Sequence, residues 1–284
     1  AGCRAGVFAT DDTTGRRNLM AAADRRSSIA FKAVRELMRR GAHTVLVSFQ
    51  HEAETVDPAL VSLLGGVPTG THWASRERET QGYLPLRKDF EESIAPMGKK
   101  TRINLRYYRK MVENELGARF APEASISRED FLELNRASAF AVSDETAVWR
   151  HESLKLLAEP VLAGIKDRDG RWISMAGGRR FNRWLEVHWL MNRNDLPAYS
   201  LSTVIRAYLI DNEAALGSER IYFQGGTIHS IRSAFQAEKV TDLVVMRRAL
   251  RAPMRLFVER MLPEDNMLRQ VLLDKELEWR PVHP

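Results

Sequence analysis

The chain has 284 residues, of which 44% are hydrophobic and 28% charged, and its formal net charge is +6. A chain of this length buries a sizeable core as one large or two smaller domains, and its composition excludes disordered and fibrous classes. No apolar run approaches the roughly 20 residues that span a bilayer, so no membrane span is expected. The modest positive charge favours acidic partners.

The single cysteine, Cys3, excludes an intramolecular disulfide and a cysteine metal cluster. The start of the chain has no apolar signal-peptide core. Both observations favour a reduced, cytoplasmic setting. The sequence begins with Ala1 rather than Met, so we expect a processed or truncated chain.

The first hundred residues predict a helix followed by short elements. Apolar residues recur at helical spacing over residues 28–40, and Gly41 ends this helix. The elements that follow are a Val-rich strand over 43–49, a short helix over 58–64, a loop over 65–70, an extended piece over 83–86 and a helical piece over 89–95.

The segment GKKTRINLRYYRK, residues 98–110, carries six Lys or Arg residues and no acidic one. It begins a helix that we expect to run to about residue 116 and to end at Gly117. Helical spacing places Tyr107 and Tyr108 on the apolar side and most cations on the other. The cations crowd the first two turns, where the helix dipole disfavours positive charge. They form either a solvated face or a face toward an anion.

The rest of the chain changes from helices to period-two strands. One helix begins at Ser127 with Asp130 as a capping partner, and a shorter one covers 151–157. The elements that follow are strands over 161–166, 171–181 and 184–191 joined by tight turns, a helix over 200–216, a strand over 221–224, a short helix over 227–235, a strand over 243–247 and a helical tail.

This order of meander, helix, strand, short helix and strand resembles the core of the GNAT acyltransferases, in their Fem-like and CelD-like branch. Four stretches carry the resemblance: DFEESIAPMGKKTRINLRYYRK (89–110), GRWISMAGGRRFNRWLEVHWLMN (170–192), AYSLSTVIRAYLIDNEAALGSERIYFQGG (198–226) and TIHSIRSAF (227–235). Together they cover roughly residues 83–247.

The resemblance implies an α/β (α+β) fold, in which a mixed, mostly antiparallel sheet is flanked by helices. Members of this branch often carry two GNAT-like halves, which here implies a tandem arrangement with a shortened first lobe. We expect a partial leading GNAT-like lobe over residues 1–79, a GNAT-like acyltransferase domain over 80–250 and a C-terminal helical tail over 251–284.

The resemblance also implies an enzyme, an N-acyltransferase in which a small-molecule amine directly attacks an activated acyl group without a metal. The donor would be acyl-CoA or the phosphopantetheine arm of an acyl carrier protein. Typical CoA-using members place a glycine-rich loop before the helix that follows the central hairpin, and its N–H groups hold the pyrophosphate. This chain has NDLPAYSLST (194–203) there, without glycine.

Two groups of residues are candidates for binding the donor. Hydroxyl side chains at the start of that helix either bind an anion or cap the helix. Cations of the basic helix would face the phosphates of the donor. The candidates are Ser200, Ser202, Thr203, Lys99, Arg102 and Arg106.

Acyl transfer to an amine requires a base, a donor to the carbonyl oxygen and often a proton for the leaving group. Strand alternation predicts one face with Glu186, His188 and Leu190 and an opposite face with Leu185, Val187, Trp189 and Met191. A neighbouring carboxylate raises the pKa of an imidazole and orients the ring. We predict His188 as general base, with Glu186 orienting it or binding the amine. The alternative is a hydrogen-bonded pair on a sheet face.

Further candidates follow this strand. Tyr199 protonates a leaving group or lines the acceptor pocket, unless it is a packed loop aromatic. Gln224 ends a strand, and His229 and Arg232 follow at i, i+3 spacing as substrate-binding candidates. Arg232 would bind a carboxylate or phosphate, unless it is a surface cation.

Two other functions stay open. One is a Fem-type transferase that uses aminoacyl-tRNA, although that branch usually has a long helical hairpin arm and this sequence predicts a single helix over 98–116. The other is a catalytically silent GNAT-like fold that binds nucleic acid or a protein through its basic helix. His43, His51 and His72 lack metal-ligand spacing, and dinucleotide, P-loop and hydrolase motifs are absent from the sequence.

Overall fold

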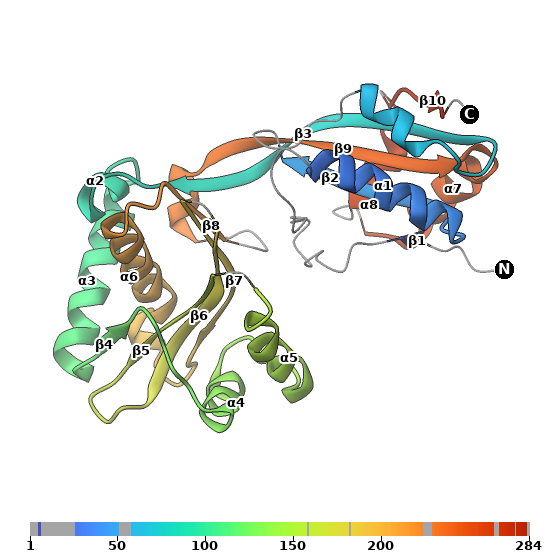
Figure 1. Ribbon diagram of the computed structural model, residues 1–284. Coiled ribbons are helices and arrows are strands. Elements are labelled where there is room, and N and C mark those ends of the chain that lie inside the picture. Colours follow the sequence, from blue (N-terminus) through green and yellow to red (C-terminus); the bar gives the residue numbers. More distant parts are fainter. Residues whose placement is uncertain are drawn as a thin grey trace. The chain divides into compact units, whose positions relative to one another are not determined.

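The structure is a computed structural model that forms two compact units (Figure 1), the first made of residues 1–80 and 237–284 and the second of residues 81–236. The residues it describes are 5–6, 26–50, 58–157, 159–181, 183–223, 229–263, 267–275 and 277–282. The units differ from the predicted segments, because the last long strand and the C-terminal helices belong with the first unit rather than with the second or with a separate tail.

Unit 1 contains a sheet in the order β1-β2-β9-β3, with β10 paired to β3. Its elements are β1 (Ala5–Gly6), α1 (Arg26–Arg39), β2 (Thr44–Gln50), the 3-10 helix η2 (Pro58–Leu64), β3 (Thr71–Pro85), β9 (Gln236–Arg247), the 3-10 helix η5 (Arg248–Leu250), α7 (Arg251–Met261), α8 (Met267–Leu273) and β10 (Arg280–Pro281). The boundary between the units falls within β3.

Both faces of the unit 1 sheet are buried. Along β9, Leu243 and Val245 pack in one cluster with residues of α1 and η2, whereas Val244 and Met246 pack in another with residues of α7 and α8. Successive strand side chains point to opposite faces. A continuous apolar run in β9 therefore supplies both cores, which is why this segment shows no polar alternation.

Unit 2 is a mostly antiparallel sheet between two layers of helices. Its elements are α2 (Phe90–Ile94), α3 (Lys99–Leu116), β4 (Arg119–Ala121), α4 (Arg128–Ala137), α5 (Asp144–Leu154), β5 (Pro160–Lys166), β6 (Trp172–Phe181), β7 (Trp184–Asn192), the 3-10 helix η3 (Pro197–Tyr199), α6 (Leu201–Ala215), β8 (Arg220–Phe223) and the 3-10 helix η4 (Ser230–Ala234). The end of β3 pairs with β8, and the order continues β7-β6-β5-β4.

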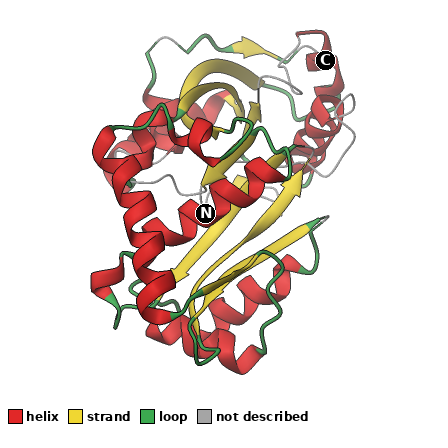
Figure 2. Cartoon of the chain, turned by 90° about the vertical axis from the view of Figure 1, so that its left-hand side faces the viewer, coloured by secondary structure: helices red, strands yellow, loops and turns green. Residues whose placement is uncertain are grey.

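The sheet of unit 2 is formed by β4 to β8 and the end of β3. Four of its strand pairs are antiparallel, and the pair of β7 and β8 is parallel. Helices α3 and α6 cover one face, and α4 and α5 cover the other (Figure 1). Figure 2 shows strands with helices on either side of them. The predicted fold class, a mixed and mostly antiparallel sheet flanked by helices, is confirmed. The predicted tandem arrangement concerns the relation of the two units and stays a prediction.

Four predicted elements differ in extent. The helix predicted over 151–157 begins earlier, at Asp144, and ends at Leu154 as α5. The extended piece at 83–86 is the end of β3, and the strand at 243–247 is the end of β9. Charged residues such as Arg76 and Glu77 interrupt the apolar pattern of β3, so pairing with other strands decides its length. The predicted helix over 227–235 is, in its described part, the 3-10 turn η4, and residues 227–228 lie outside the described residues.

Helix α3 has the predicted limits and ends at Gly117, whose φ of 58° is the left-handed conformation that glycine adopts readily. Leu105 and Val112 are buried, and Tyr108 packs against the core. The prediction that both tyrosines lie on the apolar side is wrong for Tyr107, whose side chain is 57% exposed. The buried face of α3 therefore contains fewer residues than the apolar pattern of its sequence predicts.

Across the ranges that the structure describes, no helix combines the length and the apolar character needed to cross a membrane.

Candidate functional site

Strand β7 contains a bulge at His188. The register of β6 and β7 pairs Gly178 with Val187 and Gly177 with Trp189, so His188 is the extra residue between two consecutive pairs. A bulge bends and twists a strand and often directs a side chain beside an active site. The local backbone therefore distinguishes His188 from its neighbours.

Two glycines of β6 make this bulge possible. A Cβ atom on Gly178 would lie 1.8 Å from the carbonyl oxygen of Glu186, and one on Gly177 would lie 2.0 Å from the ring of Trp189. Side chains at these positions would clash with the bulged strand. The pair of glycines inside a strand pattern is the sequence signal that indicates such a bulge.

The bulge changes which side chains share a face of the sheet. Leu185 and Val187 pack in the core with α3 and α6, whereas Trp189 and Met191 pack in the cluster with α4 and α5. The predicted strict alternation, which put these four residues on one face, is therefore wrong. One extra residue exchanges the two faces from His188 onward.

Glu186 is a buried carboxylate with a buried cation beside it. Its side chain is 1% exposed, and Arg179 Nε donates a hydrogen bond to Glu186 Oε2 at 2.8 Å. Burial on its own raises the pKa of Glu186, but the nearby imidazole of His188 and the positive charge of Arg179 bring it below its ordinary value. The carboxylate is therefore ionised at neutral pH.

His188 lies next to this carboxylate but does not form a regular hydrogen bond with it. Its Nε2 atom is 3.8 Å from Glu186 Oε2, beyond hydrogen-bond distance, and makes no hydrogen bond to any described group. The imidazole is 23% exposed. Glu186 is thus placed to act electrostatically on His188, and its burial closes it to an amine that arrives from solvent.

Among the described residues, the parallel pairing of β7 with β8 runs up to the residue just before His188. The register runs from Trp184 opposite Arg220 to Val187 opposite Phe223. Phe223 is the last described residue of β8, while β7 continues along β6. In open α/β sheets, ligands bind beyond the carboxyl ends of parallel strands. His188 is the first residue of β7 beyond that pairing.

The segments that follow these two strands are joined by a chain of hydrogen bonds. Helix α6 follows β7, and His229 follows β8. His229 Nε2 lies 2.9 Å from Thr203 Oγ1, which lies 2.8 Å from Ser200 Oγ. The sequence analysis assigns two of these side chains to donor binding and His229 to substrate binding. The structure brings all three together.

The protonation state of His229 determines which group donates in each of these hydrogen bonds. Burial, and then the charge of Arg206, lower the pKa of His229 to about 4, so the ring is neutral at pH 7. Its Nδ1 accepts from the backbone N–H of Ile231 at 3.3 Å. We therefore assign the ring proton to Nε2, which donates to Thr203, and Thr203 donates to Ser200. No group in the described part of the chain accepts the hydroxyl proton of Ser200.

Ser200 also has an unusual backbone. It precedes α6 with φ 45° and ψ 51°, in the left-handed region that a residue with a Cβ atom seldom occupies. Residues held in such conformations cluster at functional sites. The conformation that a glycine-rich loop adopts easily is thus adopted here by a serine, and its hydroxyl group lies at the start of the helix.

Arg206 is a site residue that the sequence reasoning missed. Its guanidinium lies 5.3 Å from the ring centre of Phe223, and its Nη1 donates to the carbonyl of Ser202 at 2.6 Å. The residue is 9% exposed, and burial lowers its pKa to about 10. A single arginine in an apolar helical run, LSTVIRAYLI, is the signal that indicates a buried charge.

The remaining predicted residues near this edge have different environments. Tyr199 is half-buried before α6, and burial, followed by the nearby Glu115, raises its pKa. Ser202 is half-buried in the first turn of α6, and Arg232 is exposed on η4. Gln224 lies outside the described residues.

The basic residues of α3 lie elsewhere. Arg109 pairs with Asp211 at 2.7 Å, and Tyr208 donates to Glu113 at 2.7 Å, so α3 and α6 run antiparallel. The start of α3 is therefore adjacent to the end of α6, away from Ser200. The six predicted donor-binding residues thus form two separate groups.

The cations at the start of α3 have partners within the protein. Arg106 Nε donates to Glu91 at 2.9 Å, and Arg102 donates to the carbonyls of Met97 and Ala95 at 2.5 and 3.1 Å. Lys99 is exposed. Positive charge near the start of a helix is stabilised by a nearby anion. For Arg106 this anion is the Glu91 carboxylate of α2.

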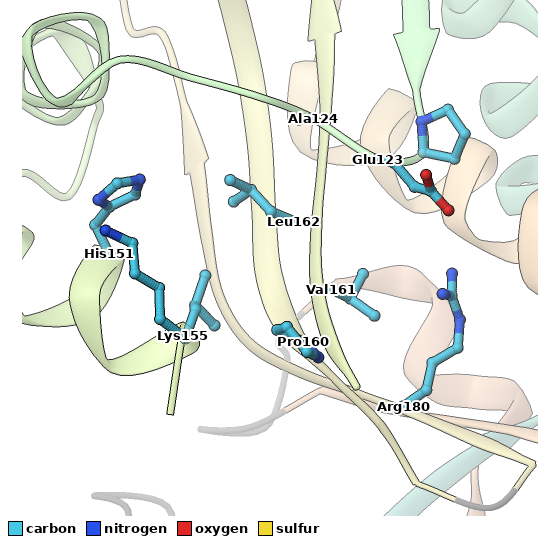
Figure 3. Close-up of a pocket in the computed structure, with 10 residues that line it drawn as sticks. Glu123, Ala124, His151, Lys155, Pro160, Val161, Leu162 and Arg180 are labelled. Atoms are coloured by element: carbon cyan, nitrogen blue, oxygen red, sulfur yellow. The ribbon is translucent and has the colours of Figure 1, made fainter. Parts of the chain in front are cut away.

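A separate cavity of about 330 Å³ lies beside the start of β5. His151 of α5 and Lys155, the residue after that helix, lie on one side of it and Glu123 and Arg180 on the other (Figure 3). It has the mixture of polar and apolar groups that small ligands use.

The charged groups around this cavity are already engaged. His151 and Lys155 both interact with Glu152, at 3.2 and 2.7 Å, and Arg180 pairs with the fully buried Glu213 at 2.7 Å. We therefore place the candidate site at His188 rather than here. In the described residues, no cluster of three or more His, Cys, Asp or Glu side chains is arranged to hold a metal ion.

No protein-family model matches this chain, and no curated protein matches it in sequence. Among solved structures, FemX matches with a TM-score of 0.51 and 10% identity, over 79% of each chain. L-PGS from Bacillus licheniformis matches with a TM-score of 0.47 and 14% identity, over 78% of this chain and 73% of that one. The C-terminal domain of a putative lysylphosphatidylglycerol synthetase from Agrobacterium fabrum matches with 0.46 and 13%, over 82% and 77%.

At these identities a match bears on the fold alone. FemX is a Fem-type protein with a GNAT fold. The chain therefore has a GNAT-like fold. The branch within that fold stays a prediction.

Proposed function

We propose that unit 2 is a GNAT-like transferase that moves an acyl group from an activated donor to an amine by direct attack. The observation that carries this proposal is the bulged His188, with the ionised Glu186 behind it, next to the last described pair of β7 and β8. An acyl group held beyond the carboxyl ends of these strands would meet a base at that position.

Each group then has a defined chemical task. The amine nitrogen attacks the acyl carbonyl carbon, and His188 accepts the amine proton as the new C–N bond forms. Glu186 stabilises the imidazolium because the two groups are close and the carboxylate is buried. The bond from the acyl carbon to the leaving sulfur breaks, and Tyr199, whose raised pKa keeps it protonated at neutral pH, supplies the proton.

The start of α6 is the part of the chain that suits an anionic donor. Because the hydrogen-bond chain from His229 ends with Thr203 donating to Ser200, the hydroxyl group of Ser200 can donate its own proton to a ligand. Helix N-termini also favour phosphate oxygens. Arg206 adds positive charge close by. These groups fit the phosphates of acyl-CoA or of a phosphopantetheine arm. On this account His229 fixes the hydroxyl chain rather than touching the substrate.

A Fem-type reaction with aminoacyl-tRNA is the second candidate. The fold likeness to FemX and the absence of glycine from residues 194–203 favour it. Exposed Lys99 and Lys100 at the start of α3 leave cations open to a nucleic acid. The acceptor would again be an amine, and His188 would keep its role.

The first test measures binding of donors by thermal stability, with acetyl-CoA, long-chain acyl-CoAs, CoA and bulk tRNA. A ligand at 100 times its Kd adds about 2.7 kcal/mol. We expect a shift with a CoA compound that Ser200→Ala reduces and Lys99→Gln leaves unchanged. A salt-sensitive shift with tRNA alone would favour the Fem-type reaction. No shift with any donor would contradict binding at α6.

The second test measures turnover with the donor so identified and a panel of amines. His188→Gln should lower kcat by roughly 10²–10⁴-fold while donor binding is retained, as expected for loss of a general base. His151→Gln, which changes a largely buried imidazole of α5 outside the proposed site, serves as the matched control and should retain full activity. Equal turnover in the wild type and His188→Gln would exclude the proposed role.

A further inference from the structure

Helix α7 of unit 1 exposes large apolar side chains beside its buried stripe. Met254 and Val258 are buried and hold the helix against the sheet. Leu256 and Phe257 are each 49% exposed, and Met261 is 67% exposed. Phe257 and Met261 are four residues apart and so lie next to each other on the helix surface. A soluble helix normally places polar residues there.

The same segment carries a surplus of arginine. Over residues 248–261 there are four arginines and one acidic residue, Glu259. Burial, and then the charges of Arg248 and Arg255, lower the pKa of Arg251, whose guanidinium lies 4.5 Å from the ring centre of Trp279. Arg248 and Arg255 thus repel Arg251, and an external anion would relieve this repulsion.

Three of these arginines are open to such an anion. Arg248, Arg255 and Arg260 are exposed, and their side chains pair with no acidic group in the described part of the chain. Arg255 and Arg260 lie in α7 with the exposed apolar residues, and Arg248 lies in η5, directly before that helix. The exposed face therefore combines positive charge with apolar side chains that are between 49% and 67% exposed.

We propose that this face of α7, formed by Leu256, Phe257 and Met261 with Arg248, Arg255 and Arg260, is a docking surface for an anionic lipid bilayer. Helices that lie in the plane of a membrane interface combine Lys or Arg with Phe and Leu in this way. Anionic headgroups meet the guanidinium groups, while the apolar side chains enter the boundary of the acyl chains.

The positive charge and the apolar side chains of this surface favour a membrane over two other partners, a second copy of the chain and a nucleic acid. A second copy of the chain would bring the arginines of two α7 helices together, and like charges across an interface oppose association. A nucleic acid would match the charge and could stack a base on Phe257, but it would leave the aliphatic side chains of Leu256 and Met261 without an apolar partner. An anionic bilayer matches both the charge and the apolar side chains.

The test is co-sedimentation of the full chain with vesicles of phosphatidylcholine, alone or mixed with phosphatidylglycerol. We expect binding to the mixed vesicles that high salt weakens. The double variants Leu256→Ser/Phe257→Ser and Arg255→Gln/Arg260→Gln should each bind about tenfold or more weakly. The control is Trp149→Ser, which removes a 68% exposed tryptophan from unit 2 and should bind like the wild type.

A gain of binding separates the proposal from damage to the fold. Glu259→Lys removes the acidic residue of the helix and should strengthen binding to the mixed vesicles. Binding that is absent, or equal in wild type and all α7 variants, overturns the proposal. So does binding to RNA, or dimer formation measured by light scattering, that the same α7 substitutions abolish while vesicle binding persists.

Discussion

The buried pair of Arg179 and Glu186 allows a quantitative test of the site. Arg179→Met removes the guanidinium that donates to Glu186 at 2.8 Å and keeps a long apolar side chain. It leaves a carboxylate that is 1% exposed without its main cation. Breaking a buried pair from one side costs about 3–5 kcal/mol, which is a large part of the roughly 5–15 kcal/mol that stabilises a typical domain.

Removing both charges should reverse most of this loss. In Arg179→Met/Glu186→Leu no charge is left buried at the pair, and such replacements are often neutral or stabilising by about 1–4 kcal/mol. The two substitutions are therefore expected to be strongly non-additive, with a coupling of about 3 kcal/mol or more. This coupling measures the pair rather than either residue alone.

The contribution of the pair also depends on pH. Because the pKa of Glu186 is lower in the folded chain than its ordinary value, this contribution is complete above the ordinary value and is lost as the pH falls through the folded one. Acidification should therefore destabilise the wild type more steeply than the double variant.

The assay is urea unfolding of the full chain followed by tryptophan fluorescence, to which unit 2 contributes Trp149, Trp172, Trp184 and Trp189. The control is Arg106→Met, which breaks a solvent-exposed pair with Glu91 and should cost about 1 kcal/mol or less. A cost below about 1 kcal/mol for Arg179→Met, or no recovery in the double variant, would refute the reasoning.

Two further predictions concern the rest of the site. His229→Gln should flatten the dependence of thermal stability on pH between about 6.5 and 4. The lowered pKa of His229 gives stability that is complete above the ordinary pKa of 6.5 and is lost as the pH falls toward 4. Melting curves across this range check it, and an unchanged slope would count against a buried neutral ring. Gly177→Ala and Gly178→Ala should each destabilise the protein by about 1–3 kcal/mol or more, measured by thermal melting. Trp189→Leu should partly rescue Gly177→Ala, whose clash is with a side chain, but not Gly178→Ala, whose clash is with the backbone of Glu186; equal rescue of both would contradict the bulge.

Local patterns in the sequence were enough to predict most elements of unit 2. The limits of α3, with Gly117 at its end, follow from helical spacing and a glycine stop, and the meander of β5, β6 and β7 follows from alternation and turns. Glu186 and His188 are close because they are two residues apart in the chain, whereas the alternation that predicted a shared face breaks at His188. These properties depend on residues close in sequence.

The bulge could not be placed from β7 alone. Its position depends on where Gly177 and Gly178 of β6 come to lie opposite β7, which is a property of the register between two strands. The glycine pair indicates an irregularity but not which residue of the partner strand becomes the extra one. The predicted faces of β7 were therefore wrong from His188 onward.

The grouping of the candidate residues depended on tertiary structure for the same reason. The hydrogen bond between Thr203 and His229 joins residues 26 positions apart, and the antiparallel packing of α3 on α6 separates Arg106 from Ser200. The sequence determined which side chains carry charge and hydroxyl groups. Only the packing of distant segments decided which charges meet a carboxylate of the protein and which hydroxyl group keeps a proton to donate, because burial and distance act through space rather than along the chain.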